Sequence, residues 1–144
     1  LETFLGLVND KEAVLVGVGN LGRALVSYPG FTRYGLRIVA LFDADVAKVG
    51  RQVGEHQVLP VSKLADLARR MHIQMGIITV PAGAAQGVAE QMVAGGISVI
   101  WNFSPTTLHV PDDVLVKNED LAAELATLSH HISLRHVEHR SMGR

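Results

Sequence analysis

The feature that most constrains the fold is a short apolar run that leads directly into three closely spaced glycines. Residues 13–18 are followed by a segment of helical period, and Gly17, Gly19 and Gly22 give the spacing G-x-G-x-x-G across the junction. In a strand–turn–helix unit the first glycine permits the tight turn, the second lets a pyrophosphate approach, and the third lets the helix pack on the strand. The N–H groups at the start of the helix face the phosphates. The motif therefore predicts a nucleotide-binding α/β domain.

The remaining apolar runs support the same class of fold. They alternate with segments of helical period, and they are continuous in apolar character, as expected for parallel strands covered by helices on both faces. The predicted strands span residues 13–18, 37–42, 75–80, 98–103 and 114–117. With 144 residues the chain has room for one domain. We predict a Rossmann-type doubly wound parallel sheet.

A last helix is expected from about residue 119 to 134, with Asn118 as its N-cap. Its apolar positions recur on one face, at Leu121, Leu125, Leu128 and Ile132. No predicted strand follows it. The stripe therefore packs either on the chain's own sheet or on another chain, and the polar residues 135–144 are expected to form a flexible tail.

Composition excludes several classes of function. The net charge is −1, and the 13 Lys and Arg residues are dispersed, so the chain lacks the basic stripe of a nucleic-acid binder. There is no cysteine, which excludes disulfides and thiolate chemistry. His130, His131, His136 and His139 lack the spacing of a helical zinc clamp, so no metal site is predicted. No apolar stretch is long enough to span a membrane, and no leader is evident, which favours a cytoplasmic protein.

The candidate ligand residues lie where predicted strands end. Asp43 follows the second strand, 21 residues after Gly22, where an acid accepts hydrogen bonds from an adenosine ribose and repels a 2′-phosphate. This position favours NAD(H). Thr79-Val80-Pro81 and Asn102-Phe103-Ser104 follow the next two strands. Because the carboxyl ends of parallel strands line the ligand crevice, both segments are placed to touch the distal half of a dinucleotide. The spacing leaves open that the prolines only end strands and that Asn102 only caps a turn.

Catalysis is not predicted. A dehydrogenase needs an acid or base beside the nicotinamide and usually a substrate domain. Neither Tyr28 nor Tyr34 is followed by a lysine four residues later, and the chain has no length left for a second domain. The chain is therefore expected to bind a cofactor without converting it, and not to be an enzyme.

Taken together and in order, the motifs resemble the Rex family of redox-sensing transcriptional repressors. The segments that carry this resemblance are residues 17–25, 42–45, 79–82, 102–105 and 118–125. The resemblance implies an NAD(H)-binding domain that joins an N-terminal winged-helix domain, with NADH favouring release from DNA. It also implies that Gly17, Val18, Gly19, Asn20 and Leu21 approach the pyrophosphate and that Asp43 approaches the ribose. Thr79, Val80, Pro81, Asn102, Phe103 and Ser104 would border the crevice toward the nicotinamide.

The resemblance also divides the chain. Residues 1–10 match the end of a linker helix, 11–117 the Rossmann domain, and 118–134 a dimerisation helix that is exchanged in a homodimer. The winged-helix domain is absent from this chain, so DNA would be bound only through that separate domain. His130 and His131 stand where the family usually has aromatic side chains.

Two other functions remain open on the residues alone. One is a CoA-binding or other nucleotide-binding domain of a metabolic enzyme, since such domains share the glycine turn. The other is a small oxidoreductase module. Asp43 favours an adenosine with free ribose hydroxyls over the 3′-phosphorylated ribose of CoA.

Overall fold

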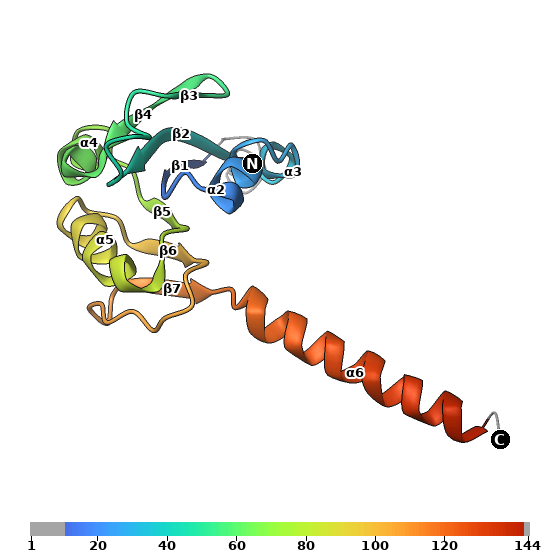
Figure 1. Ribbon diagram of the computed structural model, residues 1–144. Coiled ribbons are helices and arrows are strands. Elements are labelled where there is room, and N and C mark those ends of the chain that lie inside the picture. Colours follow the sequence, from blue (N-terminus) through green and yellow to red (C-terminus); the bar gives the residue numbers. More distant parts are fainter. Residues whose placement is uncertain (1–10, 143–144) are drawn as a thin grey trace, which may run out of the picture.

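The computed structural model describes residues 11–142, without the side chains of 121–124 and 136–142. Seven strands form one sheet in the order β3-β4-β2-β1-β5-β6-β7 (Figure 1). They are β1 Lys11–Val16, β2 Leu36–Asp43, β3 Gln52–Val53, β4 His56–Pro60, β5 Met75–Ile78, β6 Val99–Asn102 and β7 Leu115–Asn118. Neighbouring strands pair in parallel, except that β3 is antiparallel to β4. The predicted α/β class is confirmed.

Helices cover both faces of the sheet. They are α2 Asn20–Val26, α3 Gly30–Arg33, α4 Leu64–Arg70, α5 Ala82–Ala94 and α6 Leu121–Met142, with a 3₁₀ turn at Val61–Lys63. Figure 1 shows α4 and α5 on one face and α2 and α3 on the other. Side chains of β1 alternate between the two layers: Val14 and Val16 lie in the core under α4 and α5, whereas Ala13 and Leu15 lie in the opposite core.

Three elements, β3, β4 and α3, were not predicted. β3 has two residues and α3 has four, which is too short for a periodic pattern to be recognised. β4 reads His-Gln-Val-Leu-Pro and buries only Val58 completely, so it lacks the continuous apolar run of the other strands. Gly54, with φ +60°, makes the turn between β3 and β4.

The boundaries predicted for the last helix were wrong at both ends. Asn118 is not its N-cap, because the residue ends β7 and pairs with Asn102 of β6. The helix begins at Leu121 and continues past residue 134 to Met142. The continuation has a physical reason, since residues 135–142 contain no glycine or proline and the first helix-breaking residue is Gly143. The expected linker helix at residues 1–10 lies outside the described residues.

Helix α6 does not pack its apolar stripe on the sheet of its own chain. It projects away from the body (Figure 1), and the side chains of Leu125, Leu128 and Ile132 are 61–67% exposed. The sequence left open whether the stripe packs on the chain's own sheet or on another chain, and the structure does not show the first of these.

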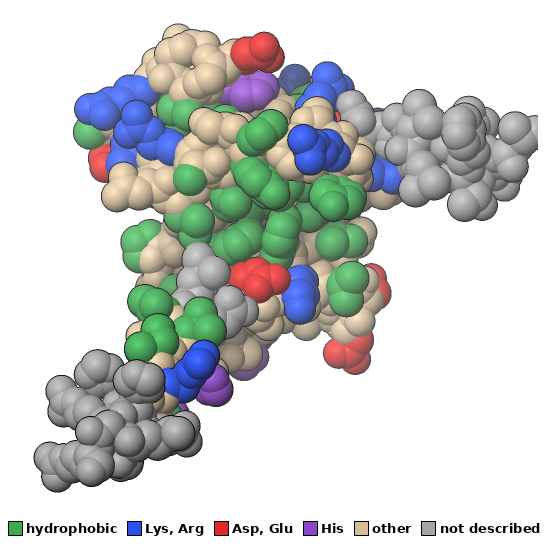
Figure 2. All heavy atoms as spheres, turned by 90° about the vertical axis from the view of Figure 1, so that its right-hand side faces the viewer, with side chains coloured by type: hydrophobic (Ala, Val, Ile, Leu, Met, Phe, Trp, Pro, Cys, Tyr) green, Lys and Arg blue, Asp and Glu red, His purple; other side chains and the backbone are tan. Residues whose placement is uncertain are grey.

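The sheet also has an uncovered apolar area on the face that carries α2 and α3. Trp101 and Phe103 are only half-buried there, and Leu115 of β7 is 65% exposed. The rings of Phe31, Trp101 and Phe103 form a contact series with centroids 5.8 and 4.8 Å apart. Figure 2 shows hydrophobic side chains gathered across the middle of this face, on the side from which α6 leaves.

Candidate functional site

The candidate site lies at the carboxyl edge of the sheet, beside the end of β1. β1 is flanked by β2 and β5. After β1 the chain forms β2, β3 and β4 on one side of it, and then β5, β6 and β7 on the other side. This is the topological switch point of the sheet, where ligands of doubly wound proteins bind. The segment that follows β1 is the glycine turn, Gly17 to Gly22.

The three glycines of the turn have different reasons to be glycine. Gly17 has φ +106°, and a Cβ there would lie 2.7 Å from the carbonyl carbon of Thr79. A Cβ on Gly22 would lie 2.0 Å from the carbonyl oxygen of Gly17. Gly19 has φ −89°, and a Cβ on it would meet nothing within 4 Å. The fold therefore requires Gly17 and Gly22, whereas Gly19 leaves an open space beside the turn.

Asp43, at the end of β2, holds the turn. It is 9% exposed, and its Oδ2 accepts a hydrogen bond from the backbone N–H of Val18 at 2.8 Å. Its Oδ1 accepts another from the N–H of Asp45 at 2.8 Å. A carboxylate has about four acceptor sites, so both oxygens keep capacity for ligand hydroxyl groups. Asp43 is thus a structural partner of the turn as well as the predicted ribose acceptor.

Thr79, the residue after β5, is hydrogen-bonded to the glycine turn on the side opposite Asp43. Its N–H donates to the carbonyl oxygen of Val16 at 2.9 Å, and its hydroxyl contacts the carbonyl oxygens of Val16 and Gly17. Val80 is half-buried against the core, and the exposed Pro81 precedes α5. The segment lies beside the glycine turn, with the Thr79 hydroxyl engaged inside the chain.

The segment after β6 lies at the same edge, but two of its three predicted residues are buried. Asn102 has no exposed surface, and its side-chain amide is hydrogen-bonded within the chain. Ser104 is 5% exposed, and its hydroxyl has no hydrogen-bond partner in the structure. Phe103 is half-buried, and its N–H donates to the carbonyl oxygen of Ile78 in β5. Of these three residues, only Phe103 has appreciable exposed side-chain surface.

Three cations near the turn were not predicted from the sequence. Arg23, Lys48 and Arg51 line a cavity of about 60 Å³ together with Val18 and Val58. None of the three forms an ion pair with another described residue. No spacing rule assigns these side chains to a ligand: Arg23 lies in α2, and Lys48 and Arg51 lie in the loop before β3, a strand that was not predicted. They place positive charge around a cavity that is also lined by Val18, the residue before Gly19.

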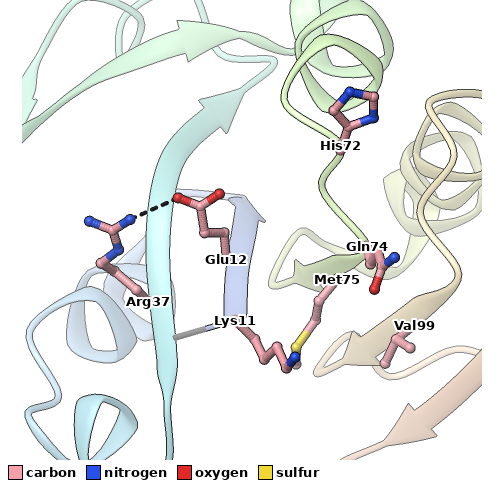
Figure 3. A pocket seen from close by; sticks show the side chains of 7 residues that line it. All are labelled: Lys11, Glu12, Arg37, His72, Gln74, Met75 and Val99. Atoms are coloured by element: carbon pink, nitrogen blue, oxygen red, sulfur yellow. Dashed lines mark hydrogen bonds and ion pairs between the residues drawn. The ribbon is translucent and has the colours of Figure 1, made fainter. Parts of the chain in front are cut away.

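A second cavity, of about 640 Å³, lies at the opposite edge of the sheet, where the strands begin (Figure 3). Its walls include Glu12 and Arg37, which form an ion pair at 2.8 Å, and His72. Because it is at the amino ends of the strands, it is separate from the glycine turn.

Among the side chains that the structure describes, which exclude those of 121–124 and 136–142, no group of three or more His, Asp or Glu is arranged to hold a metal ion. None of the helices described for this chain has the length and apolar character needed to cross a membrane.

The glycine geometry predicts that two matched substitutions differ in their effect on stability. Gly22→Ala should lower the free energy of unfolding by about 1–3 kcal/mol, because its methyl group would overlap the Gly17 carbonyl oxygen. Gly19→Ala should change it by less than about 0.5 kcal/mol, because the methyl group meets open space. Urea denaturation of both variants measures the difference, and equal destabilisation would contradict the assignment.

Comparison with known proteins places this chain among nucleotide-binding domains. Residues 8–106 match the family model described as CoA binding domain. The redox-sensing transcriptional repressor Rex of Carboxydothermus hydrogenoformans is 46% identical over 128 residues, which cover 89% of this chain and 62% of that protein. The chain thus spans less than two thirds of that relative.

Solved structures agree with the sequence relatives. RSP, a Rex-family repressor crystallised with β-NADH, is 33% identical, with a TM-score of 0.83 over 96% of this chain and 67% of that one. The same protein with β-NAD⁺ and operator DNA gives a TM-score of 0.84 at 32% identity, over 99% of this chain and 65% of that one.

Proposed function

The chain belongs to the Rex family of redox-sensing transcriptional repressors, and we propose that its residues 11–117 form the NAD(H)-binding domain of such a repressor. In this role the domain binds the cofactor without converting it and responds to the ratio of NADH to NAD⁺. DNA is bound by a winged-helix domain outside this chain. The protein acts in the cytoplasm, where a repressor meets its operator.

The observation that carries this proposal is the open space at Gly19. The fold does not require glycine there, since φ is −89° and a Cβ would touch nothing. A pyrophosphate that approaches the turn does require it, because a side chain would occupy the same space. Arg23, Lys48 and Arg51 supply positive charge nearby, which favours an anionic ligand.

The adenosine and nicotinamide halves then lie on opposite sides of the turn. Asp43 accepts the ribose hydroxyls on the β2 side, and the segments after β5 and β6 border the nicotinamide. The surface there includes Val80 and Phe103, both half-buried and apolar. Burial of the positively charged ring of NAD⁺ against such side chains is less favourable than burial of the neutral ring of NADH. We therefore expect NADH to bind more tightly.

The proposed assembly is a homodimer in which α6 of each protomer packs on its partner. Leu125, Leu128 and Ile132 are exposed on α6, and the sheet face around Trp101 and Leu115 is uncovered. A two-fold exchange of α6 between two protomers buries both apolar surfaces, because the helix of each protomer covers the sheet face of the other. The exchanged helix would then lie near the partner's crevice, so both protomers would sense the cofactor.

Substitution of Gly19 by Val tests the proposed ligand. The isopropyl group fills the space needed by the pyrophosphate, so the affinity for NADH should fall at least about tenfold, or about 1.4 kcal/mol. Titration calorimetry with NADH, NAD⁺, NADPH and CoA measures the affinities of the original chain and the variant, and thermal unfolding verifies that the variant is folded.

Two outcomes of this titration count against the proposal. Normal NADH binding by folded Gly19→Val would remove the phosphate assignment. Tighter binding of CoA than of NADH by the original chain would favour the CoA-binding alternative, to which the description of the matching family model also points.

Substitution of Asp43 by Asn tests the ribose contact. The change keeps the shape but removes the charge, and charge-assisted hydrogen bonds contribute about 1.5–3 kcal/mol, so NADH affinity should fall about 10- to 150-fold. Asp66→Asn is the matched control, since that carboxylate is 67% exposed and, among the described residues, forms an ion pair only with Arg70 on its own helix. Equal affinities for both variants would exclude Asp43 from the site.

Substitution of Leu128 by Glu tests the helix exchange. A buried leucine contributes about 1.5–3 kcal/mol, and a symmetric dimer buries it twice, so the dimer dissociation constant should rise at least about 100-fold. His130→Glu is the control, because residue 130 lies about 200° around the helix from residue 128. Sedimentation equilibrium measures both variants, and an unaffected Leu128→Glu dimer would contradict the exchange.

A further inference from the structure

Asn102 connects the loop at the nucleotide crevice to the residues that precede α6. Its Nδ2 donates to the carbonyl oxygen of Thr106 and to Oδ1 of Asn118, both at 3.0 Å. Its Oδ1 accepts from the N–H of Ser104 at 3.0 Å. One fully buried amide thus holds two points of the loop and one point at the end of β7.

Two further hydrogen bonds strengthen this connection. The backbone carbonyl of Asn102 accepts from the N–H of Glu119 at 2.8 Å, and the indole Nε1 of Trp101 donates to Glu119 Oε1 at 3.4 Å. Glu119 lies two residues before α6 begins. Consecutive residues of β6 therefore hold the segment from which α6 starts.

The loop that follows Asn102 contains a buried hydroxyl group without a hydrogen-bond partner among the described residues. Ser104 is 5% exposed and its buried hydroxyl has no partner, which is an unfavourable arrangement. A cavity of about 280 Å³ lies between residues 104–107 and 118–120, so there is room for movement. Because the Ser104 N–H is bonded to Asn102, a shift that gives the hydroxyl a partner would also act on the Asn102 amide.

We propose that Asn102 is a positioning residue: it sets the direction in which α6 leaves the body and couples that direction to the crevice loop, without contacting the nucleotide. The proposal rests on the proposed function, in which α6 is the exchanged dimer element. It differs from the sequence-based expectation that Asn102 borders the nicotinamide directly.

Because α6 is long, a small change of direction at its start causes a large displacement at its far end. The helix has 22 residues, which corresponds to about 33 Å at 1.5 Å per residue. A rotation of about 10° at its base would displace its far end by about 6 Å. A small change at Asn102 would therefore reposition the apolar stripe that the partner protomer binds.

The test uses the full chain, three single variants and the double variant Asn102→Asp/Asn118→Ala. Asn102→Asp keeps the shape but removes both donors, and Asn118→Ala removes one acceptor from an exposed position. The control is Gln86→Ala, because the Gln86 amide makes two 2.8 Å hydrogen bonds to the backbone of His109 and ties the same loop to α5 instead of α6.

The direction of α6 is measured by double electron–electron resonance, which gives the distance between two spin labels. The chain has no cysteine, so Arg135→Cys on α6 and Gln57→Cys on β4 accept spin labels specifically, with excess unlabelled chain to isolate distances within one protomer. NADH affinity and the dimer dissociation constant are measured on the unlabelled variants.

The expected result is a shifted or broadened label distance in Asn102→Asp and Asn118→Ala, with a dimer dissociation constant raised at least about tenfold and non-additive effects in the double variant. Gln86→Ala should leave the distance unchanged. Should Asn102→Asp fail to fold, Asn118→Ala carries the same test.

Unchanged distances and dimerisation in the folded Asn102 and Asn118 variants would overturn the proposal. So would weaker NADH binding by Asn102→Asp with the distance and the dimer intact, which would make Asn102 a ligand contact. A monomeric original chain would instead contradict the helix exchange of the proposed function, while the label distance would still decide the role of Asn102.

Discussion

The close approach between the glycine turn and its two neighbouring strands is the constraint on which the rest of the structure depends. The N–H of Gly17 bonds to Phe42 of β2, Asp43 holds Val18, and Thr79 after β5 contacts the Gly17 carbonyl oxygen. A Cβ on Gly17 or Gly22 would prevent this approach. The turn is therefore rigid before any ligand arrives, and the space at Gly19 is preformed.

The layered fold turns this local contact into a site. Side chains of the central strands alternate between two cores, and helices cover both cores. The carboxyl end of β1 lies at the switch point of the sheet, between β2 and β5. Polar and charged groups from distant segments gather there. The apolar residues near Phe103 and the cations near Arg51 lie at different parts of this edge, which suits a ligand with a neutral ring and charged phosphates.

The single protomer leaves large apolar side chains exposed to solvent. Leu125 and Leu128 on α6 are exposed, and so is Leu115 on the sheet. An apolar stripe in water contributes nothing to stability, whereas the same stripe on a partner contributes twice in a symmetric assembly. In the proposed homodimer, assembly and cofactor binding would be coupled, since Asn118 and Glu119, which precede α6, are hydrogen-bonded to Asn102 at the end of β6.

The sequence by itself determined the parts that depend on local spacing: the strand–turn–helix unit, five of the seven strands, the fold class and the apolar stripe of α6. The tertiary structure alone decided what each polar side chain does. Asp43 bonds to a residue 25 positions away, Asn102 to one 16 away and Thr79 to one 62 away. Periodicity and motifs describe neighbours in the chain, whereas hydrogen-bond partners and burial are set by strand order and register, which only the folded sheet defines.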